Sequence, residues 1–194
     1  MIKSKKLSRF KDIRHAFFNR LNGVSSGIYK SLNCGAGSSD NNKNILKNLE
    51  IVGKKIKSNL NKIVLLNQTH SDKFYYIDKK SKLNNKRFDG DALITNKSNT
   101  PIGVLTADCA PILLFDKKNK VVAVIHAGWK GAYKEIVKKV IKFMTKKGSS
   151  TGNIIAVIGP CISLKSYEVK QGFITKFIKK DKKTKFFFKK IKGK

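Results

Sequence analysis

Apolar residues recur at helical spacing in the segment that follows residue 40. Four aliphatic side chains stand at i, i+4, i+7 and i+11, so they would line one face of a helix. They are Ile45, Leu49, Val52 and Ile56. The polar residues 40–42 just before them offer side chains that can cap the free N–H groups of a first helical turn. The pattern predicts a helix over 42–57.

A second and longer apolar stripe runs through residues 130–148. Its members repeat at steps of three and four from Ala132 to Met144, with lysines between them, which is typical of a helix that packs one face on a core. Gly148 follows the stripe, and glycine accepts the left-handed conformation that ends many helices. We therefore predict one helix through this segment, with Gly148 at its C-cap.

Compact apolar runs predict the strands. Residues 62–70 and 74–78 are β-rich runs separated by polar residues. Residues 102–116 and 120–129 hold two apolar runs joined by a short polar link, which predicts a hairpin of two buried strands. Residues 153–160 predict another buried strand, because a continuous apolar run there stops at a Gly-Pro pair.

Length and composition bound the class of protein. The chain has 194 residues and is 40% hydrophobic, which suits one globular domain and excludes a disordered chain. We expect a basic leader at 1–14, a main domain at 15–175 and a lysine-rich tail at 176–194. The apolar runs are too short to span a bilayer, so we predict no membrane span.

Cysteine usage and the chain start indicate the compartment. The three cysteines, Cys34, Cys109 and Cys161, are an odd number and include no CxxC pair, which argues for reduced thiols. The first residues are basic but lack the apolar core of a signal peptide. We therefore predict a cytoplasmic protein.

The formal net charge of +31 at pH 7 raises the question of a nucleic-acid partner. Lys and Arg number 43 against 12 Asp and Glu, yet only four of the basic residues are arginine. Proteins that read bases depend on the arginine fork, whereas scattered lysines form a solvated basic surface. We predict no specific nucleic-acid partner, and the sequence sets no oligomeric state.

Three side chains stand where apolar strands meet polar or glycine-containing sequence, namely His70, Cys109 and His126. If the last two lie on paired strands and His70 ends a neighbouring one, three N and S ligands converge and leave a fourth position open, which is a catalytic zinc arrangement. Each also has a plain structural alternative, as a small core thiol or as a hydrogen-bonded strand-end histidine. The other histidine, His15, has less telling surroundings, as do Cys34 and Cys161.

Five strings add a family resemblance. They occur in the order QTHS (68–71), DALIT (91–95), TADCAPILLFD (106–116), VVAVIHAGWKG (121–131) and IGPCISLKSYEV (158–169). Together they resemble the laccase-domain family of purine nucleoside phosphorylases, also called the peptidoglycan editing factor or multicopper polyphenol oxidase family. HAFFNRLNGVSSGIYKSLNCG (15–35) is similar to that family's N-terminal signature, so the resemblance covers residues 15–169.

The resemblance implies both a fold and an activity. The implied fold is α+β, a layered sandwich of mixed β-sheets with flanking helices in a single domain. The implied ligands of one zinc ion are His70, Cys109 and His126. The implied reaction is phosphorolysis of adenosine, inosine and S-methyl-5′-thioadenosine to the free base and a ribose 1-phosphate, with adenosine deamination as a companion activity. Purine nucleosides and phosphate would then be the partners.

The chain departs from the family pattern at two points. The family's HAGW string is usually followed by arginine, and here Lys130 keeps the charge without the bidentate fork. Family members also continue for some tens of residues beyond the YEV string, where this chain has a lysine-rich tail. We therefore expect a domain shortened at its C-terminus.

Further residues are assigned as candidates. Lys130, at the start of the second predicted helix, is a phosphate ligand or a solvated lysine. Asp108, beside the cysteine, is a catalytic proton carrier or an orienting group. Asn33 and Gln68 offer amides to ribose or base, unless they are plain turn and strand-end residues. Arg20, within the N-terminal signature, is a weaker substrate-binding candidate.

Three alternative functions stay open at this point. A metal-free hydrolase would use Cys109 as nucleophile and His126 as base. A copper oxidase is suggested by one family name, although such enzymes need many histidines and this chain has three. A basic binding protein without catalysis would follow if the shortened C-terminus had removed the activity.

Overall fold

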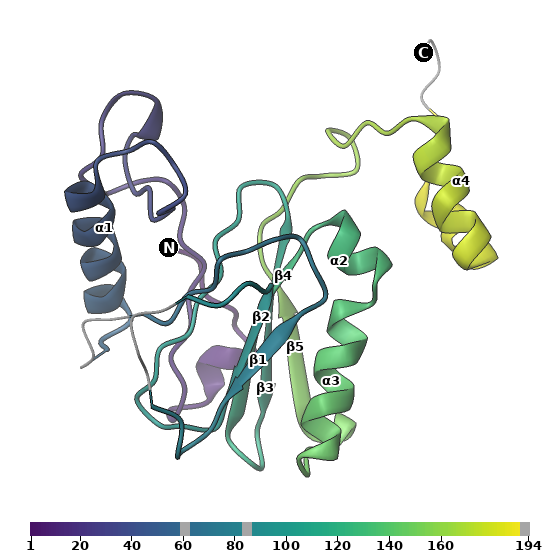
Figure 1. Ribbon diagram of the computed structural model, residues 1–194. Helices are drawn as coiled ribbons and strands as arrows, with labels where there is room; N and C mark the ends of the chain where they lie inside the picture. Colours follow the sequence, from purple (N-terminus) through teal and green to yellow (C-terminus); the bar gives the residue numbers. More distant parts are fainter. Residues whose placement is uncertain (59–62, 83–86, 191–194) are drawn as a thin grey trace. The chain divides into compact units, whose positions relative to one another are not determined.

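A mixed sheet of five strands lies in the first of two compact units, Met1–Cys161; the second unit is Ile162–Lys194 (Figure 1). The computed structural model describes residues 1–58, 63–82 and 87–190. The sheet has the order β1-β2-β4-β3-β5, in which β1 and β2 run parallel and the other pairs are antiparallel. The strands are β1 (Phe74–Ile77), β2 (Ala92–Thr95), β3 (Ala110–Asp116), β4 (Val121–Ala127) and β5 (Ile154–Ile158).

The predicted hairpin is confirmed as β3 and β4. Their register runs from Asp116 opposite Val121 at the turn to Ala110 opposite Ala127 at the other end. The buried carboxylate of Asp116 accepts hydrogen bonds from the N–H groups of Lys118 and Asn119, at 2.9 and 3.1 Å, so it closes the turn. A fixed turn fixes the register of the pair, and a slip of one residue would exchange the two faces of each strand.

Two apolar layers cover the sheet, one on each face. On one face, helix α3 (Ile136–Lys146) packs Ile136, Val140 and Met144 against β2, β3 and β4. The other face includes Leu93 and Val124 and is covered by the side chains of Val64, Leu66, Ile102 and Val104. This layered arrangement of a mixed sheet and helices confirms the predicted α+β class. The predicted boundaries after residues 14 and 175 stay predictions.

The prediction of a buried strand over 153–160 is correct in type and wrong in burial. Among the residues that the structure describes, β5 pairs only with β3, so it lies at an edge of the sheet. Its residues are half-buried or exposed, and the side chain of Ile158 is 66% exposed. Apolar composition indicates a strand, but the neighbours that cover a strand are set by other parts of the chain.

The β-rich run predicted over 62–70 does not form a regular strand among its described residues, 63–70. Isolated bridges join Val64 to Ile102 and Asn67 to Asp89, both parallel. Leu65 and Leu66 are nevertheless buried, so the apolar content serves the core. The neighbouring run, 74–78, was predicted correctly and contains β1.

The first predicted helix is confirmed as α1 (Asn42–Lys55), which lies in Figure 1 on the side of the sheet away from α3. The side chain of Asn41 caps it by accepting a hydrogen bond from the N–H of Lys43 at 2.8 Å. Its buried face includes Ile45 and also Asn48, whose amide binds the backbone of Val24 and Asn33. This polar contact ties α1 to the N-terminal loops.

The second predicted helix is divided in two, which corrects the prediction of one continuous helix. α2 (Trp129–Tyr133) has five residues, and α3 starts after Glu135, which has φ 61°. A left-handed residue cannot continue a right-handed helix, so the chain turns there. The apolar spacing did not reveal this break. Ala132 in α2 and the apolar residues of α3 still repeat every three or four positions in the sequence, as they would in one continuous helix.

The end of α3 confirms the predicted role of Gly148. Its φ is +97°, and its N–H donates to the carbonyl of Thr145 at 2.9 Å. The N–H of Ser149 donates to the carbonyl of Met144 at 3.0 Å. These two bonds form a Schellman motif, which glycine favours because it has no Cβ.

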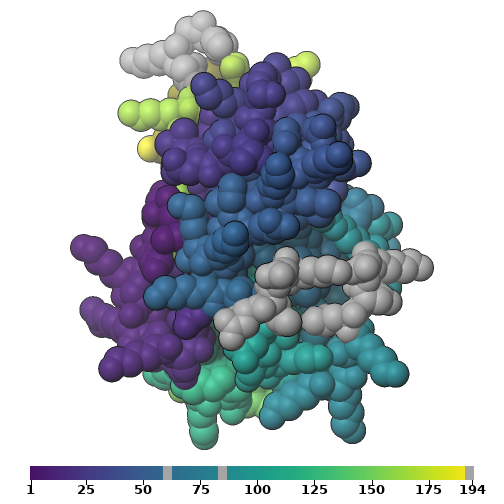
Figure 2. Space-filling view, turned by 90° about the vertical axis from the view of Figure 1, so that its left-hand side faces the viewer, coloured from purple at the N-terminus to yellow at the C-terminus, as the bar shows by residue number. Residues whose placement is uncertain are grey.

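Residues 1–14 are part of the first unit and pack on its sheet through Phe10. A 3-10 helix, η1 (Leu7–Arg9), buries Leu7, and the ring of Phe10 meets the edge of Phe115 with centroids 5.2 Å apart. A second short 3-10 helix is η2 (Gly27–Tyr29), and a third, η3 (Thr151–Asn153), precedes β5. In Figure 2, residues from the first third of the chain, purple to blue, form much of the face turned to the viewer.

The second unit, described over residues 162–190, begins with an irregular segment and continues into two helices. It contains α4 (Gln171–Lys180) and a 3-10 helix, η4 (Lys182–Phe187). The rings of Phe173 and Phe177 meet that of Phe188, at centroid distances of 6.3 and 6.1 Å. No described helix of the chain has both the length and the apolar content needed to cross a bilayer.

Replacing Gly148 by alanine tests the end of α3. We expect Gly148→Ala to lower the free energy of unfolding by about 1–2 kcal/mol, because alanine at positive φ is strained even though its Cβ would meet no atom within 4 Å. Chemical denaturation measures the change. Gly152→Ala is the matched control, since its Cβ would only reach Ser150 at 4.0 Å and no positive φ is required. Equal stability of the two variants would contradict the strain argument.

Candidate metal centre

Three side chains that are far apart in the sequence converge at one end of the sheet. One ligand atom from each of His70, Cys109 and His126 lies within 4.8 Å of the others. The sulfur of Cys109 is 3.8 Å from Nε2 of His70, and the two imidazole rings meet edge to face with centroids 4.7 Å apart. The predicted group is therefore assembled, and it can hold a metal ion.

The sheet explains why these residues meet. β1, β2 and β3 all begin at the end of the sheet where β4 finishes, as the register shows with Ala92 opposite Ile125 and Ala110 opposite Ala127. Cys109 directly precedes β3, and His126 is the last residue but one of β4. His70 lies in the loop that leads into β1. The residue types were evident from the sequence, and the strand order brings them together.

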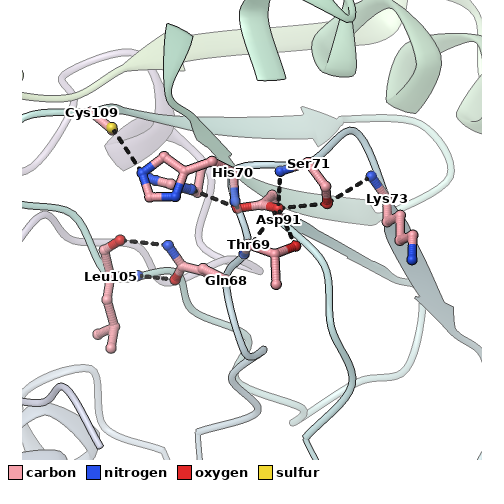
Figure 3. A network of polar contacts seen from close by, with 9 residues as sticks. Gln68, Thr69, His70, Ser71, Lys73, Asp91, Leu105 and Cys109 are labelled. Carbon is pink, nitrogen blue, oxygen red and sulfur yellow. Dashed lines mark hydrogen bonds and ion pairs between the residues drawn. The ribbon is translucent and has the colours of Figure 1, made fainter. Parts of the chain in front are cut away.

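A buried carboxylate, Asp91, makes hydrogen bonds to both histidines, and Figure 3 shows it beside the backbone of His70 and Ser71. It is 0% exposed and directly precedes β2. One of its oxygens lies 2.8 Å from Nδ1 of His126, so the histidine donates from Nδ1 and keeps Nε2 as its ligand atom. The same oxygen accepts the N–H of His70 at 3.0 Å.

The other carboxylate oxygen of Asp91 binds the next residue of the His70 loop. Ser71 donates to it twice, from its N–H at 2.6 Å and from its hydroxyl at 2.7 Å. Burial alone would raise the pKa of Asp91, but the hydrogen bonds from Ser71 and His126 outweigh burial and lower that pKa below its usual value. Asp91 is therefore an ionised acceptor at neutral pH.

The segment that carries Cys109 is attached to the segment that carries His70. The side-chain amide of Gln68 donates to the carbonyl of Leu105 and accepts from the N–H of the same residue, both at 2.7 Å (Figure 3). Burial, followed by the carboxylates of Asp108 and Asp91, raises the pKa of the Cys109 thiol. Without a cation nearby, this thiol keeps its proton more firmly than an ordinary cysteine.

Gly128 leaves the space in which the ligands meet. A Cβ at this position would lie 2.7 Å from Cδ2 of His70 and 3.0 Å from the sulfur of Cys109. The backbone of Gly128 has φ −73° and ψ 169°, which any residue can adopt, so only space requires glycine here. Gly128 thus keeps space free beside the imidazole of His70 and the thiol of Cys109. Together with His126 these side chains can hold a metal ion, and two imidazoles with one thiol are a donor set that suits zinc.

Two other candidate residues lie near the group in the sequence. Asp108 is exposed and adjoins Cys109. Lys130 is exposed on α2, two residues after Gly128, with its Nζ 5.7 Å from the centre of the Trp129 ring. The sequence predicted that Lys130 would stand at the N-terminus of a long helix, but it lies in the five-residue α2. Lys130 can therefore attract an anion through the charge of its side chain, without the added effect of a long helix.

The structure gives Arg20 and Asn33 contacts in the N-terminal loops. The carbonyl of Arg20 accepts hydrogen bonds from the N–H groups of Ser31 and Leu32, and its side chain is exposed. The amide of Asn33 donates to Ser38 and Asp40, at 2.8 and 3.0 Å. The contacts described for these two residues join parts of the N-terminal region rather than the metal group.

The sequence reasoning missed Asp91 and Gly128. Asp91 is the first residue of the string DALIT, and Gly128 is the third residue of HAGW. The sequence analysis used both strings for the family resemblance and assigned no function to either residue. Asp91 could have been identified from the sequence because it directly precedes an apolar run. A buried charge at such a position is costly unless it is paired or hydrogen-bonded. For Gly128 the signal was a glycine two residues after a candidate ligand.

A family model described as multi-copper polyphenol oxidoreductase laccase matches residues 14–194. A relative named purine nucleoside phosphorylase, from Bacteroides thetaiotaomicron, is 34% identical over 87% of this chain and 65% of its own length. Another of that name, from Rickettsia prowazekii, is 34% identical over 92% of this chain and 70% of its own length.

The fold is also similar to solved structures. The crystal structure of the Neisseria meningitidis protein NMB0706 has a TM-score of 0.78 and 30% sequence identity, and the match covers 90% of this chain and 68% of that one. The chain thus spans about two thirds of the length of these relatives.

Replacing Gly128 by alanine tests the space between the ligands. We expect Gly128→Ala to bind Zn²⁺ at least about tenfold more weakly than the unchanged chain, because the new methyl group would displace His70 and Cys109. Competition with a chelating dye measures the affinity. Gly53→Ala, on α1 with nothing within 4 Å of its Cβ, is the control and should bind as before. Unchanged affinity in Gly128→Ala would show that the metal does not bind between these side chains.

Proposed function

We propose that this chain, which belongs to the family described as multi-copper polyphenol oxidoreductase laccase, is a zinc-dependent purine nucleoside phosphorylase. The proposed substrates are adenosine, inosine and S-methyl-5′-thioadenosine together with inorganic phosphate, and adenosine deamination is a proposed companion activity. The observation that carries the proposal is the convergence of His70, Cys109 and His126 in a chain whose relatives are named purine nucleoside phosphorylase.

Zinc is the proposed metal because of the donor set. Two imidazoles and one thiol suit zinc, and three protein ligands leave a position for water or substrate. A zinc ion bound there would supply Lewis-acid chemistry. The family description names several coppers, yet this chain has three histidines, and Nε2 of His15 accepts a hydrogen bond from the N–H of Ser4 at 2.9 Å. Two histidines are too few for a multicopper centre.

The residues around the group can serve phosphorolysis. In that reaction a phosphate oxygen bonds to the anomeric carbon while the bond from that carbon to the purine nitrogen breaks, and the purine leaves with the electron pair and takes up a proton. Lys130 supplies a positive charge for the phosphate, as an ammonium without the arginine fork. The exposed carboxyl group of Asp108, next to Cys109, is the proposed proton carrier.

Arg20, Asn33 and Gln68 rank lower as substrate residues. The amides of Asn33 and Gln68 already have partners, and giving up such a hydrogen bond costs about 0.5–1.5 kcal/mol. The exposed side chain of Arg20 is available, but its described backbone contacts belong to the N-terminal loops. Substrate binding is therefore proposed first for Lys130.

The metal-free hydrolase gains less support than the phosphorylase. A cysteine nucleophile needs a lowered pKa, whereas burial and two carboxylates raise the pKa of Cys109. We propose a cytoplasmic location as well, supported by the three cysteines, which are all unpaired.

Metal analysis tests the proposed cofactor. The purified chain should hold about one zinc ion and essentially no copper, since the described residues contain one such group of ligands. Cys109→Ala should lose most of the zinc, and Cys161→Ala should keep it, because Cys161 is a free, exposed cysteine outside the group. Elemental analysis by mass spectrometry gives the ratio. Full zinc content in Cys109→Ala would overturn the assignment, and copper in place of zinc would favour an oxidase.

A nucleoside assay with and without phosphate tests the reaction. Adenosine or inosine should give free base only when phosphate is present, with ribose 1-phosphate as co-product. Lys130→Ala should raise the KM for phosphate, and Lys130→Arg should leave it unchanged or lower it. Lys138→Ala is the control, because that lysine is 75% exposed on α3 and pairs with Glu135.

Each other result of this assay points to a different function. Equal release of base without phosphate would indicate a hydrolase. Release of ammonia from adenosine would demonstrate the deaminase activity. A zinc-loaded chain that converts none of the three nucleosides would favour the non-catalytic binding protein.

A further inference from the structure

We propose that Asp91 is the positioning residue that assembles the metal site before the metal arrives, by holding His70 and His126 at once. This inference rests on the metal site of the proposed function and is independent of which nucleoside is converted. It assigns Asp91 a role through the two histidines, without contact to substrate.

The first contact of Asp91 sets the ring of His126. The Nδ1 atom lies 2.8 Å from the carboxylate, and the two side chains are 4% and 0% exposed, so water does not compete for this hydrogen bond. The backbone N–H of His126 also donates to the carbonyl of Asp91 at 2.7 Å. Two attachments fix both the position and the rotation of the imidazole. A donated Nδ1–H leaves the lone pair on Nε2, the tautomer that a metal ligand requires.

The second contact sets the backbone of the His70 loop. His70 has φ 55°, a left-handed conformation that costs a residue with a side chain about 1–2 kcal/mol. The N–H groups of His70 and Ser71 both point at the carboxylate of Asp91, at 3.0 and 2.6 Å (Figure 3). Hydrogen bonds to a buried charge offset the cost of that conformation. The strained residue is a ligand, so the bonds that hold the loop also aim the imidazole.

The carboxylate of Asp91 has little capacity left for any other task. A carboxylate offers about four acceptor positions. Here one oxygen accepts from His70 and His126, and the other accepts twice from Ser71. Thr69 adds longer contacts of 3.4 and 3.5 Å to that second oxygen. Because all of its acceptor positions are occupied, the Asp91 carboxylate is not free to bind the metal or to accept a proton in the reaction. Its contacts fit a positioning role instead.

Asp91 is itself held firmly. Its N–H donates to the carbonyl of Lys73 at 2.9 Å, and the next residue begins β2, which pairs with β1 and β4. The carboxylate therefore keeps its place when the site is empty. Its negative charge, buried beside two imidazoles, also favours a cation over a neutral occupant.

The test compares two buried aspartates. Asp91→Asn keeps the size of the side chain and removes its charge and half of its acceptor capacity. Asp116→Asn is the matched control, because Asp116 is also 0% exposed and caps a loop, but it lies at the hairpin end of β3, about 20 Å along the strand from Ala110. Both variants should lose stability, so stability alone does not distinguish them.

The decisive measurement is metal binding to the full-length apoprotein. We expect Asp91→Asn to bind Zn²⁺ about 10–100-fold more weakly, the usual effect of removing a group that orients metal ligands. The Co²⁺ derivative should show weaker and shifted visible bands, which report the ligand geometry directly. Asp116→Asn should keep the affinity and the spectrum of the unchanged chain.

A second variant guards against a failure to fold. Ser71→Ala removes one hydrogen bond to Asp91 and leaves the carboxylate and His126 in place, so it should weaken binding by less than Asp91→Asn does. The proposal is overturned if folded Asp91→Asn, or Ser71→Ala when Asp91→Asn does not fold, binds Zn²⁺ as tightly as the unchanged chain with the same Co²⁺ spectrum. An unchanged chain that binds no metal would overturn the proposed function itself, and the positioning role with it.

Discussion

The pairing of β3 with β4 is the constraint on which the rest of the first unit depends. β4 also pairs with β2, and β3 with β5, so one hairpin determines where four of the five strands lie. The register that places Ala110 opposite Ala127 brings Cys109 to the end of β4 where His126 lies. A slip of one residue would move both the core side chains and the ligands to the wrong face.

Two buried aspartates satisfy the polar backbone at opposite ends of this sheet. Asp116 binds the N–H groups of the hairpin turn, and Asp91 binds those of the His70 loop. Each keeps a charge inside the protein at the cost of desolvation, which only several hydrogen bonds can offset. At the hairpin the result is a fixed turn, whereas at the other end it is a fixed pair of histidines.

Local patterns predicted the parts of the structure that local chemistry determines. Helical spacing predicted α1, the apolar runs predicted the β3–β4 hairpin, and ligand types at strand ends predicted the metal group. The break at Glu135 was missed because apolar spacing does not register one left-handed residue between two helices. The exposure of β5 was missed because the neighbours of a strand are set by distant segments. Asp91 was missed for the same reason, since its partners lie 20 and 35 positions away in the sequence.

Burial is graded across the three ligands: His70 is exposed, Cys109 is half-buried and His126 is buried. A metal ion held among them would have solvent nearest to the imidazole of His70 and protein interior behind the imidazole of His126. The site would therefore be open to water or substrate from the side of His70 and closed from the side of His126.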